Sequence, residues 1–290
     1  MLEAVPNVSE GRDSSVVADI ENAFASAAHV LDVHSDEDHH RSVFTIVGGP
    51  EELADSLVAG AARAVELIDL RLHEGVHPRV GAVDVVPLVP LAPDDMDEAA
   101  EAALAVARRL GEELGLTVFL YGEVGQGRRP VFFRRGGLAE LERRVSSGEL
   151  APDFGPPLLD LRSGAALVGA RRPLVAYNLV LASDDVSIAR DLAASVRESG
   201  GGLPGVQAIG LLLPRSGRVQ VSMNLVDLDR TQLHEAVEFV RAEGARRGVE
   251  IADGELVGLV PATVVAAAAA AGVRVPGIDE GRVLENALPL

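Results

Sequence analysis

The second half of the chain alternates between short apolar runs and segments in which an apolar residue recurs at every third or fourth position. Runs of four to eight residues rich in Val, Ile and Leu predict buried strands, and apolar residues at helical spacing predict amphipathic helices. Ile188, Leu192 and Val196, for example, lie four residues apart. The predicted elements are a strand at 174–181, a helix at 184–199, strands at 206–213 and 218–226, a helix at 231–247 and an extended segment at 249–260.

The first half repeats this order with less regular edges. Its predicted elements are a strand at 2–8, a helix at 13–28, strands at 30–34 and 42–47, a helix at 50–68, a strand at 83–90, a further helix at 95–114 and a further strand at 118–121. The order β-α-β-β-α-β in each half is that of the ferredoxin-like motif. We therefore predict an α/β (α+β) protein of two ferredoxin-like βαββαβ subdomains, with mixed or antiparallel sheets that face one another across a cleft.

The boundary between the two subdomains is expected near residues 169–173. It follows the Pro/Gly-rich segment 152–164, which has no periodicity to sustain an element. A chain of 290 residues is long enough for two domains. The predicted subdomains are residues 1–173 and 174–290.

Composition narrows the chemistry. All 26 basic residues are arginines, and the chain has no cysteine, lysine or tryptophan. Thiol nucleophiles, disulfides, Cys-based metal sites and lysine Schiff bases are therefore excluded. The net charge of −18 argues against binding to nucleic acid or to an anionic membrane, because both require a basic surface.

The amino terminus lacks a basic segment followed by an apolar run, so no secretory signal is expected. The apolar stretch 264–273 is shorter than the roughly 20 residues that span a bilayer. We expect a cytoplasmic protein.

His77 is the first candidate for catalysis. It lies in a Gly/Pro-punctuated loop, residues 72–81, that leads directly into the apolar strand at 83–90. A histidine there can act as an acid or base near neutral pH. The alternative is a loop histidine without a task.

Three further segments carry candidate chemistry. After the first strand, Asn7, Ser9, Glu10 and Arg12 precede a helix start, where a carboxylate or phosphate can bind; Asp13 or Ser14 is expected as the helix cap. The segment 32–42 contains three histidines, which predict either a metal site or, through His34 and Arg41, substrate-binding groups. The third segment interleaves arginines with two phenylalanines: Arg128, Arg129, Phe132, Phe133, Arg134 and Arg135. This pattern is typical of a nucleic-acid surface, but in an acidic chain it favours a local positive patch that binds a polyanionic small molecule.

These segments, in this order and followed by residues 118–123, 151–156 and 221–225, resemble the glutamate formiminotransferase family, including the amino-terminal part of formiminotransferase-cyclodeaminases. The resemblance is collinear from residues 5–7 to residues 256–261. It covers the transferase part alone, so cyclodeaminase activity is not implied.

The resemblance implies a homodimer that transfers the formimino group of N-formimino-L-glutamate to tetrahydrofolate, its co-substrate, with no metal ion. The catalytic base of the family's His-Pro-Arg motif falls on His77. Asn7, His34, Arg41 and Arg79 are the possible assisting residues. The folate-binding stretch of the family falls on Gly155, Pro156, Pro157, Leu158, Leu159, Asp160, Leu161, Arg162, Ser163 and Gly164.

The chain departs from the animal members at His34, where they carry an acidic residue that supports the catalytic histidine. A carboxylate would raise the basicity of His77 more than a second histidine does, and Asp36 and Asp38 are candidates to take its place. Three functions therefore stay open: the formimino transfer itself, a folate-binding relative that lacks transfer or uses another formimino or formyl donor, and a metal-dependent enzyme built on His34, His39 and His40.

Overall fold

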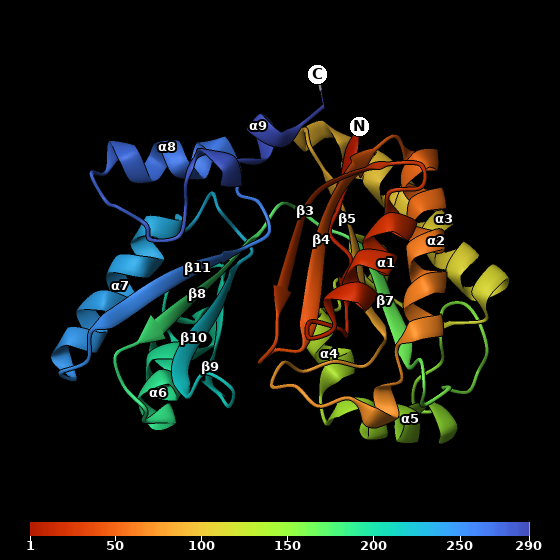
Figure 1. Ribbon diagram of the computed structural model, residues 1–290, viewed down its shortest axis with the longest axis horizontal. Helices are drawn as coiled ribbons and strands as arrows, with labels where there is room; N and C mark the ends of the chain where they lie inside the picture. Colours follow the sequence, from red (N-terminus) through yellow and green to blue (C-terminus); the bar gives the residue numbers. More distant parts are fainter. Residues whose placement is uncertain (290) are drawn as a thin grey trace. The chain divides into compact units, whose positions relative to one another are not determined.

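The chain forms two units, Met1–Arg172 and a second that begins at Pro173. They are seen in a computed structural model that describes residues 1–289 (Figure 1). The structure is mixed α/β, with one sheet in each unit: a seven-stranded mixed sheet and a four-stranded antiparallel sheet.

The sheet of the first unit runs, from one edge to the other, β3, β4, then β1 and β2 one after the other along the same position, then β5, β7 and β6. Its strands are β1 (Leu2–Ala4), β2 (Asn7–Val8), β3 (His29–Asp36), β4 (Arg41–Gly48), β5 (Val83–Pro90), β6 (Thr117–Gly122) and β7 (Ala165–Ala170). The single strand predicted at 2–8 is thus divided. Pro6 lies in the gap and has no N–H to donate to a neighbouring strand.

Three long helices cover one face of this sheet, α1 (Ser14–Phe24), α2 (Pro50–Leu67) and α3 (Met96–Leu114) (Figure 1). Phe44 and Ile46 of β4 are completely buried against them, together with Phe24 of α1. Because side chains alternate across a strand, Arg41 and Val43 point to the opposite face. Asp13 caps α1 as expected, since its carboxylate accepts hydrogen bonds from the backbone of Ser15 at 2.9 Å and Val16 at 3.3 Å.

Part of the opposite face is covered by two shorter helices, α4 (Pro130–Arg134) and α5 (Gly137–Ser146). Phe133 and Leu141 from these helices pack on Phe119 of β6 and Leu167 of β7. The polar residues described below lie on this same face, beside that cluster.

In the second unit the strand order is β11-β8-β10-β9, and all three pairings are antiparallel. Val175, Tyr177 and Leu179 of β8 are fully buried with residues of α6 and α7, so the helices cover one sheet face. The elements of the unit are β8 (Val175–Leu181), α6 (Val186–Val196), β9 (Val206–Leu213), β10 (Arg218–Leu225), α7 (Leu233–Arg246), β11 (Ile251–Val257), α8 (Ala262–Ala270) and α9 (Leu284–Ala287). The β-α-β-β-α-β order predicted for this half is present, with boundaries within about three residues.

Several elements were not predicted from the sequence. The strand β7 pairs in parallel with both β5 and β6, and the prediction placed its last residues at the domain boundary. Its sequence is alanine- and glycine-rich, so neither alternation nor a β-branched run identifies it. The helices α4, α5, α8 and α9 were also missed, and α4 and α9 are too short to display a helical period.

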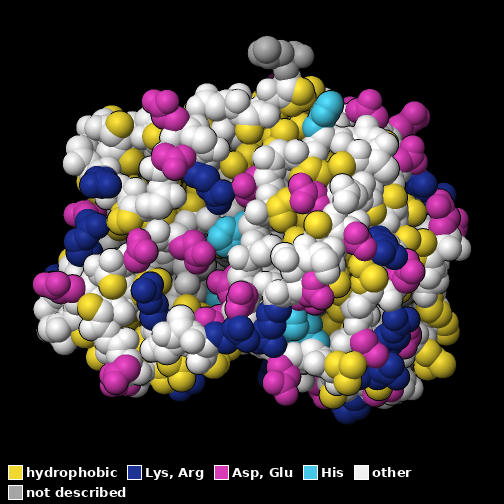
Figure 2. All heavy atoms as spheres, in the orientation of Figure 1, with side chains coloured by type: hydrophobic (Ala, Val, Ile, Leu, Met, Phe, Trp, Pro, Cys, Tyr) yellow, Lys and Arg dark blue, Asp and Glu magenta, His cyan; other side chains and the backbone are white. Residues whose placement is uncertain are grey.

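Among residues 1–289, no helix combines the length and apolar character needed to cross a membrane. Acidic and basic side chains are interspersed over the face seen in Figure 2, so on that face the net charge of −18 does not gather into one patch.

Candidate active site

The loop that carries His77 is fixed against the turn between β3 and β4. It lies between the 3-10 segment η1 (Leu70–Leu72) and β5. The backbone N–H of Val76 donates to the carbonyl of Asp38 at 3.2 Å. A Cβ at Gly75 would lie 2.5 Å from the carbonyl oxygen of His39, so this approach requires a glycine.

Arg79 holds the loop from within. Its guanidinium donates to the carbonyl oxygens of His39 at 2.8 Å and of His77 at 2.7 Å, and it also contacts the His73 ring. Burial, together with the charge of Arg134, lowers the pKa of Arg79 to about 10 against the opposing influence of Asp84. Arg79 therefore fixes the His77 loop through hydrogen bonds to its backbone and to that of the β3–β4 turn.

The imidazole of His77 is hydrogen-bonded to Arg41, the first residue of β4. Arg41 Nη1 lies 2.8 Å from His77 Nε2. Arginine can only donate, so Nε2 is the acceptor, and in the neutral ring the proton sits on Nδ1. Burial lowers the pKa of His77 well below 6.5, and the charges of Arg41 and Arg134 lower it further. His77 is therefore neutral at physiological pH.

The Nδ1 atom of His77 is buried and has no hydrogen-bond partner in the part of the chain that the structure describes. A buried N–H without a partner costs about 1–3 kcal/mol. A bound substrate that accepts a hydrogen bond from Nδ1 would remove this cost. The ring thus has one nitrogen engaged by Arg41 and the other available to a ligand.

A buried ion pair lies beside His77. Asp84, on β5, is only 1% exposed, and its carboxylate binds the guanidinium of Arg134 at the end of α4. The other carboxylate oxygen accepts the backbone N–H of Val80 at 2.7 Å. Asp84 therefore joins α4 to the backbone that follows the His-Pro-Arg motif.

No carboxylate contacts His77 among the described residues. The carboxylate of Asp36, one of the two proposed substitutes for the family's acidic residue, accepts the backbone N–H of His39 at 2.6 Å and lies 4.0 Å from the His39 ring. The immediate partner of His77 is a cation instead.

Glu10 holds His40, which in turn stacks on His73. Burial alone would raise its pKa, but hydrogen bonds from His40 and from the backbone of Asp13 and Arg12 lower that pKa to about 2. His40 Nε2 lies 3.0 Å from the carboxylate, and the His40 ring stacks on His73 with centroids 3.9 Å apart.

These contacts give His40 and His73 structural roles. Among residues 1–289, no three His, Cys, Asp or Glu side chains are arranged to hold a metal ion. The ring of His39 lies 5.9 Å from that of His77, whereas His40 is turned toward Glu10. The structure therefore offers no support for the metal-dependent alternative based on His34, His39 and His40.

Asn7 and His34 lie on the same sheet face as Arg41. In the register, Val43 of β4 is opposite both Asn7 of β2 and His34 of β3, and residues paired across a sheet share a face. Asn7 is buried and donates through its side-chain amide to the carbonyl of Val5 at 2.9 Å. Sheet pairing thus brings three of the four proposed assisting residues together, and the loop adds Arg79.

The segment 155–164 reaches the His77 region at its carboxyl end. Ala82 donates to the carbonyl of Ser163 at 2.8 Å, and Gly164 forms an isolated bridge with Gly81. The turn before it is closed by Asp160, whose carboxylate accepts hydrogen bonds from Arg162 and Ser163 at 3.0 Å each. Earlier in the segment, Leu158 and Leu161 are 65% and 45% exposed, so the segment presents apolar surface.

The arginine set at 128–135 does not form one surface patch. Phe133 is fully buried and Arg134 reaches Asp84, while Arg128 and Arg144 stack on the partly exposed Phe132 at 5.6 Å and 4.5 Å from its centroid. The contribution of the set to the candidate site is Arg134 alone.

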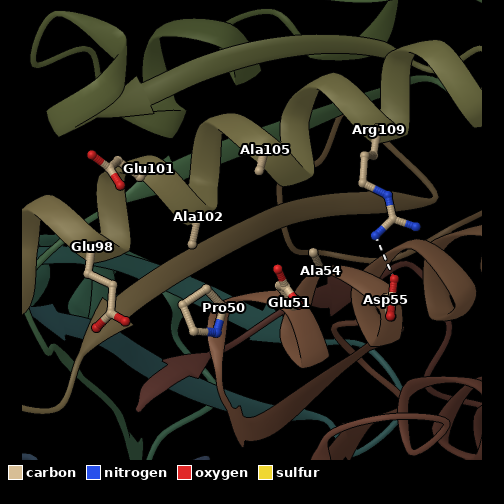
Figure 3. A pocket seen from close by; sticks show the side chains of 9 residues that line it. All are labelled: Pro50, Glu51, Ala54, Asp55, Glu98, Glu101, Ala102, Ala105 and Arg109. Carbon is tan, nitrogen blue, oxygen red and sulfur yellow. Dashed lines mark hydrogen bonds and ion pairs between the residues drawn. The ribbon is translucent and has the colours of Figure 1, made fainter.

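A groove elsewhere on the first unit has the opposite charge. It lies between α2 and α3, has a volume of about 460 Å³, and displays Glu51, Glu98 and Glu101 beside an ion pair of Arg109 with Asp55 at 2.7 Å (Figure 3). Carboxylates repel an anionic substrate. The cationic surroundings of His77 are the better candidate site.

The sequence analysis missed Asp84, and it did not anticipate the role of Arg134. A signal for Asp84 was available, because an aspartate inside the otherwise apolar strand 83–90 is rarely buried without a partner. Tyr121 of β6, which is buried and hydrogen-bonded to Arg171, was also missed; burial raises its pKa. Nothing in the local sequence indicates that these residues share one sheet face.

Comparison with known proteins identifies the class. Residues 1–171 match the formiminotransferase domain, N-terminal subdomain, and residues 176–274 match the formiminotransferase domain. The two matches cover most of the chain, and the chain belongs to the formiminotransferase family.

Individual relatives agree along the whole length. The chain is 38% identical to a protein of Thermoplasma acidophilum named glutamate formimidoyltransferase, over 99% of the chain and 96% of that protein. A Streptococcus pyogenes protein of the same name is 35% identical over 99% of the chain and 98% of its own length. The pig formimidoyltransferase-cyclodeaminase is 39% identical over 93% of the chain, which corresponds to 52% of that longer protein.

Proposed function

We infer that the chain is a glutamate formimidoyltransferase, which transfers the formimino group of N-formimino-L-glutamate to tetrahydrofolate and releases L-glutamate. The observation that carries this is the end-to-end similarity to two proteins of that name, at 38% and 35% identity, in a chain whose His77 lies in a cationic site. Such a site suits a donor substrate that carries two carboxylates.

The transfer forms a bond between N5 of tetrahydrofolate and the formimino carbon and breaks the bond from that carbon to the glutamate nitrogen. A proton must leave N5, and one must reach the departing nitrogen. We propose that His77 accepts the first proton and returns it to the glutamate nitrogen, so that the ring ends the reaction neutral. The exposed leucines of the segment 155–164 would contact the folate ring system.

The four assisting residues divide by what they touch. Arg41 contacts His77 directly, and Arg79 fixes the loop, so we assign Arg41 to substrate binding and Arg79 to positioning. Asn7 and His34 lie on the sheet face beside Arg41, where we propose that they contact the substrate.

The experiment is to incubate the protein with tetrahydrofolate and formiminoglutamate and to measure the absorbance of the 5,10-methenyl form after acid treatment. We expect turnover in the wild type and a loss of about 10²–10⁴-fold in His77→Ala, the usual contribution of one acid–base group. His29→Ala is the matched control, because His29 is exposed at the start of β3. Wild-type turnover in His77→Ala would remove His77 from the mechanism.

The same assay separates the alternatives. Binding of tetrahydrofolate without product would support a folate-binding relative that lacks transfer, and product from another formimino or formyl amino acid would identify a different donor. We also propose a cytoplasmic homodimer that needs no metal ion; sedimentation of the purified protein and metal analysis test the last two of these statements.

A further inference from the structure

Three arginines surround His77, and only one is without a partner that could hold it in place. Arg134 is bound by the carboxylate of Asp84, and Arg79 by the carbonyl oxygens of His39 and His77. The single hydrogen bond that Arg41 makes within residues 1–289 goes to Nε2 of His77. A neutral imidazole is a weaker partner for guanidinium than a carboxylate, which accepts two charge-assisted hydrogen bonds.

The charges of the site are out of balance. The groups around His77 and Arg41 are Arg41 itself from β4, Arg79 from the loop, Arg134 from α4, Asp84 from β5, His39 from the β3–β4 turn and Asp36 from the end of β3. Asp84 contacts Arg134, and Asp36, the register partner of Arg41, lies 4.0 Å from the His39 ring; both carboxylates raise the pKa of Arg41, against the stronger effect of its burial. The positive charge of Arg41 is partly buried and uncompensated by contact, which favours the binding of an anion.

The same contact makes His77 a poor proton acceptor. The lone pair of Nε2 is the position at which the ring would accept a proton, and Arg41 occupies it with an N–H donor. A positive charge 2.8 Å away also opposes the formation of imidazolium. A base in this arrangement works only after the guanidinium has turned away or has been neutralised.

We propose that Arg41 is a substrate-binding residue that controls His77: a carboxylate of the donor substrate takes its guanidinium, and His77 Nε2 is thereby released to accept a proton. The proposal rests on the proposed function for the identity of the donor, a dicarboxylic amino acid. It adds that binding of the donor changes the proton affinity of His77, which membership of the family does not imply. The site becomes basic only when the donor is bound, so the empty enzyme keeps a neutral histidine with little tendency to take up a proton.

The test measures the pKa of His77 directly, by NMR of the full chain labelled in its histidine rings, with His77→Asn to identify the resonance. L-Glutamate, the product that carries both carboxylates, is the probe. We expect it to raise the proton affinity of His77 in the wild type by about 10- to 1000-fold, the effect of neutralising one adjacent charge. L-Glutamine amide, in which both carboxylates are replaced by amides, should leave the affinity unchanged.

Variants at position 41 give an independent arm. In Arg41→Gln we expect His77 to have the raised proton affinity without glutamate and no response to glutamate. Arg41→Lys keeps the charge and should retain a response to glutamate, which also shows that the site still folds. Arg63→Gln, at a partly exposed arginine paired with Asp19 and Glu66, is the control and should behave as the wild type.

The proposal is overturned if glutamate leaves the His77 pKa of the wild type unchanged, or if Arg41→Gln has the same His77 pKa as the wild type. The transfer assay on the same samples keeps the two claims apart. Transfer without a glutamate response refutes the coupling and leaves the proposed function intact. A glutamate response without transfer refutes the proposed function and leaves the coupling of Arg41 to His77 intact.

Discussion

Replacing Asp84 by asparagine should destabilise the first unit by about 3 kcal/mol, the lower end of the cost of leaving one partner of a buried ion pair uncompensated. The side chains of Asp84 and Arg134 are 2% and 15% exposed, so water cannot replace the lost carboxylate charge. Asparagine keeps an oxygen that can accept the N–H of Val80. The substitution therefore removes the charge and leaves the size and one hydrogen bond nearly unchanged.

The matched control is Asp55→Asn. Asp55 also binds an arginine, at 2.7 Å, but the two side chains are 61% and 33% exposed. Exposed ion pairs contribute about 0.2–1 kcal/mol, so this variant should stay close to the wild type. For a unit of 172 residues, about 3 kcal/mol corresponds to a decrease in unfolding midpoint of about 6–12 °C, and the control to about 4 °C or less.

Thermal unfolding followed by circular dichroism measures both variants against the wild type. Equal, small losses in the two variants would show that the Asp84–Arg134 pair contributes no more than a surface pair. Arg134→Met, alone and in the Asp84→Asn background, completes the double-mutant cycle. In the Asp84→Asn background, removal of the uncompensated charge should recover part of the lost stability, and a further loss of the same size would contradict the ion-pair explanation.

Three more predictions concern stability. Glu10→Gln should lower the free energy of unfolding by about 3 kcal/mol at pH 7, because the folded pKa of about 2 lies below the unfolded value of 4.5. This stabilisation is present above pH 4.5 and is lost as the pH falls toward 2, so the unfolding curves of wild type and variant should converge there. A constant difference at all pH values would be contrary evidence. Gly155→Ala should lower the free energy of unfolding by about 3 kcal/mol or more, because φ is +80° and a Cβ would lie 1.8 Å from a carbonyl oxygen. The control Gly148→Ala, with φ +73° and open space, should cost about 1 kcal/mol in the same urea titration. Equal costs would refute the steric explanation. Tyr177→Phe should lower the free energy of unfolding in urea by about 1–3 kcal/mol, because the tyrosine hydroxyl donates at 2.6 Å to the carbonyl of Pro276, which would lose that partner. An unchanged midpoint would count against this hydrogen bond.

The long periodic elements could be predicted from the sequence, and the additional strand could not. The strand β5 occupies the predicted range 83–90, and α2 begins at the predicted Pro50. In both cases the apolar pattern is strong and a proline or glycine marks an end. The strand β7 is instead defined by its pairing with β5 and β6, which begin 82 and 48 residues before β7 begins. A single sequence does not contain that tertiary information.

The features of the candidate site also divide into those that the sequence predicts and those that depend on tertiary structure. The loop position of His77 and the polar density of residues 32–42 were visible in the sequence, because loops that follow breaks in pattern commonly carry chemistry. The contact between Arg41 and His77 depends on the register of β3 with β4 and on the fit of Gly75 against His39. Asp36, one of the two candidates for a carboxylate that supports His77, is directed at the backbone of the turn.

A cationic surrounding and a catalytic base make opposite demands on His77. Arginines favour the binding of a dicarboxylate donor, but the same charges lower the pKa of the imidazole and weaken it as a base. The conflict exists only while the site is empty, since each substrate carboxylate that binds an arginine cancels part of the charge that depresses the pKa. Binding energy from a part of the donor remote from the reacting carbon is then used to strengthen the base, which links recognition of the carboxylates to the rate of proton transfer.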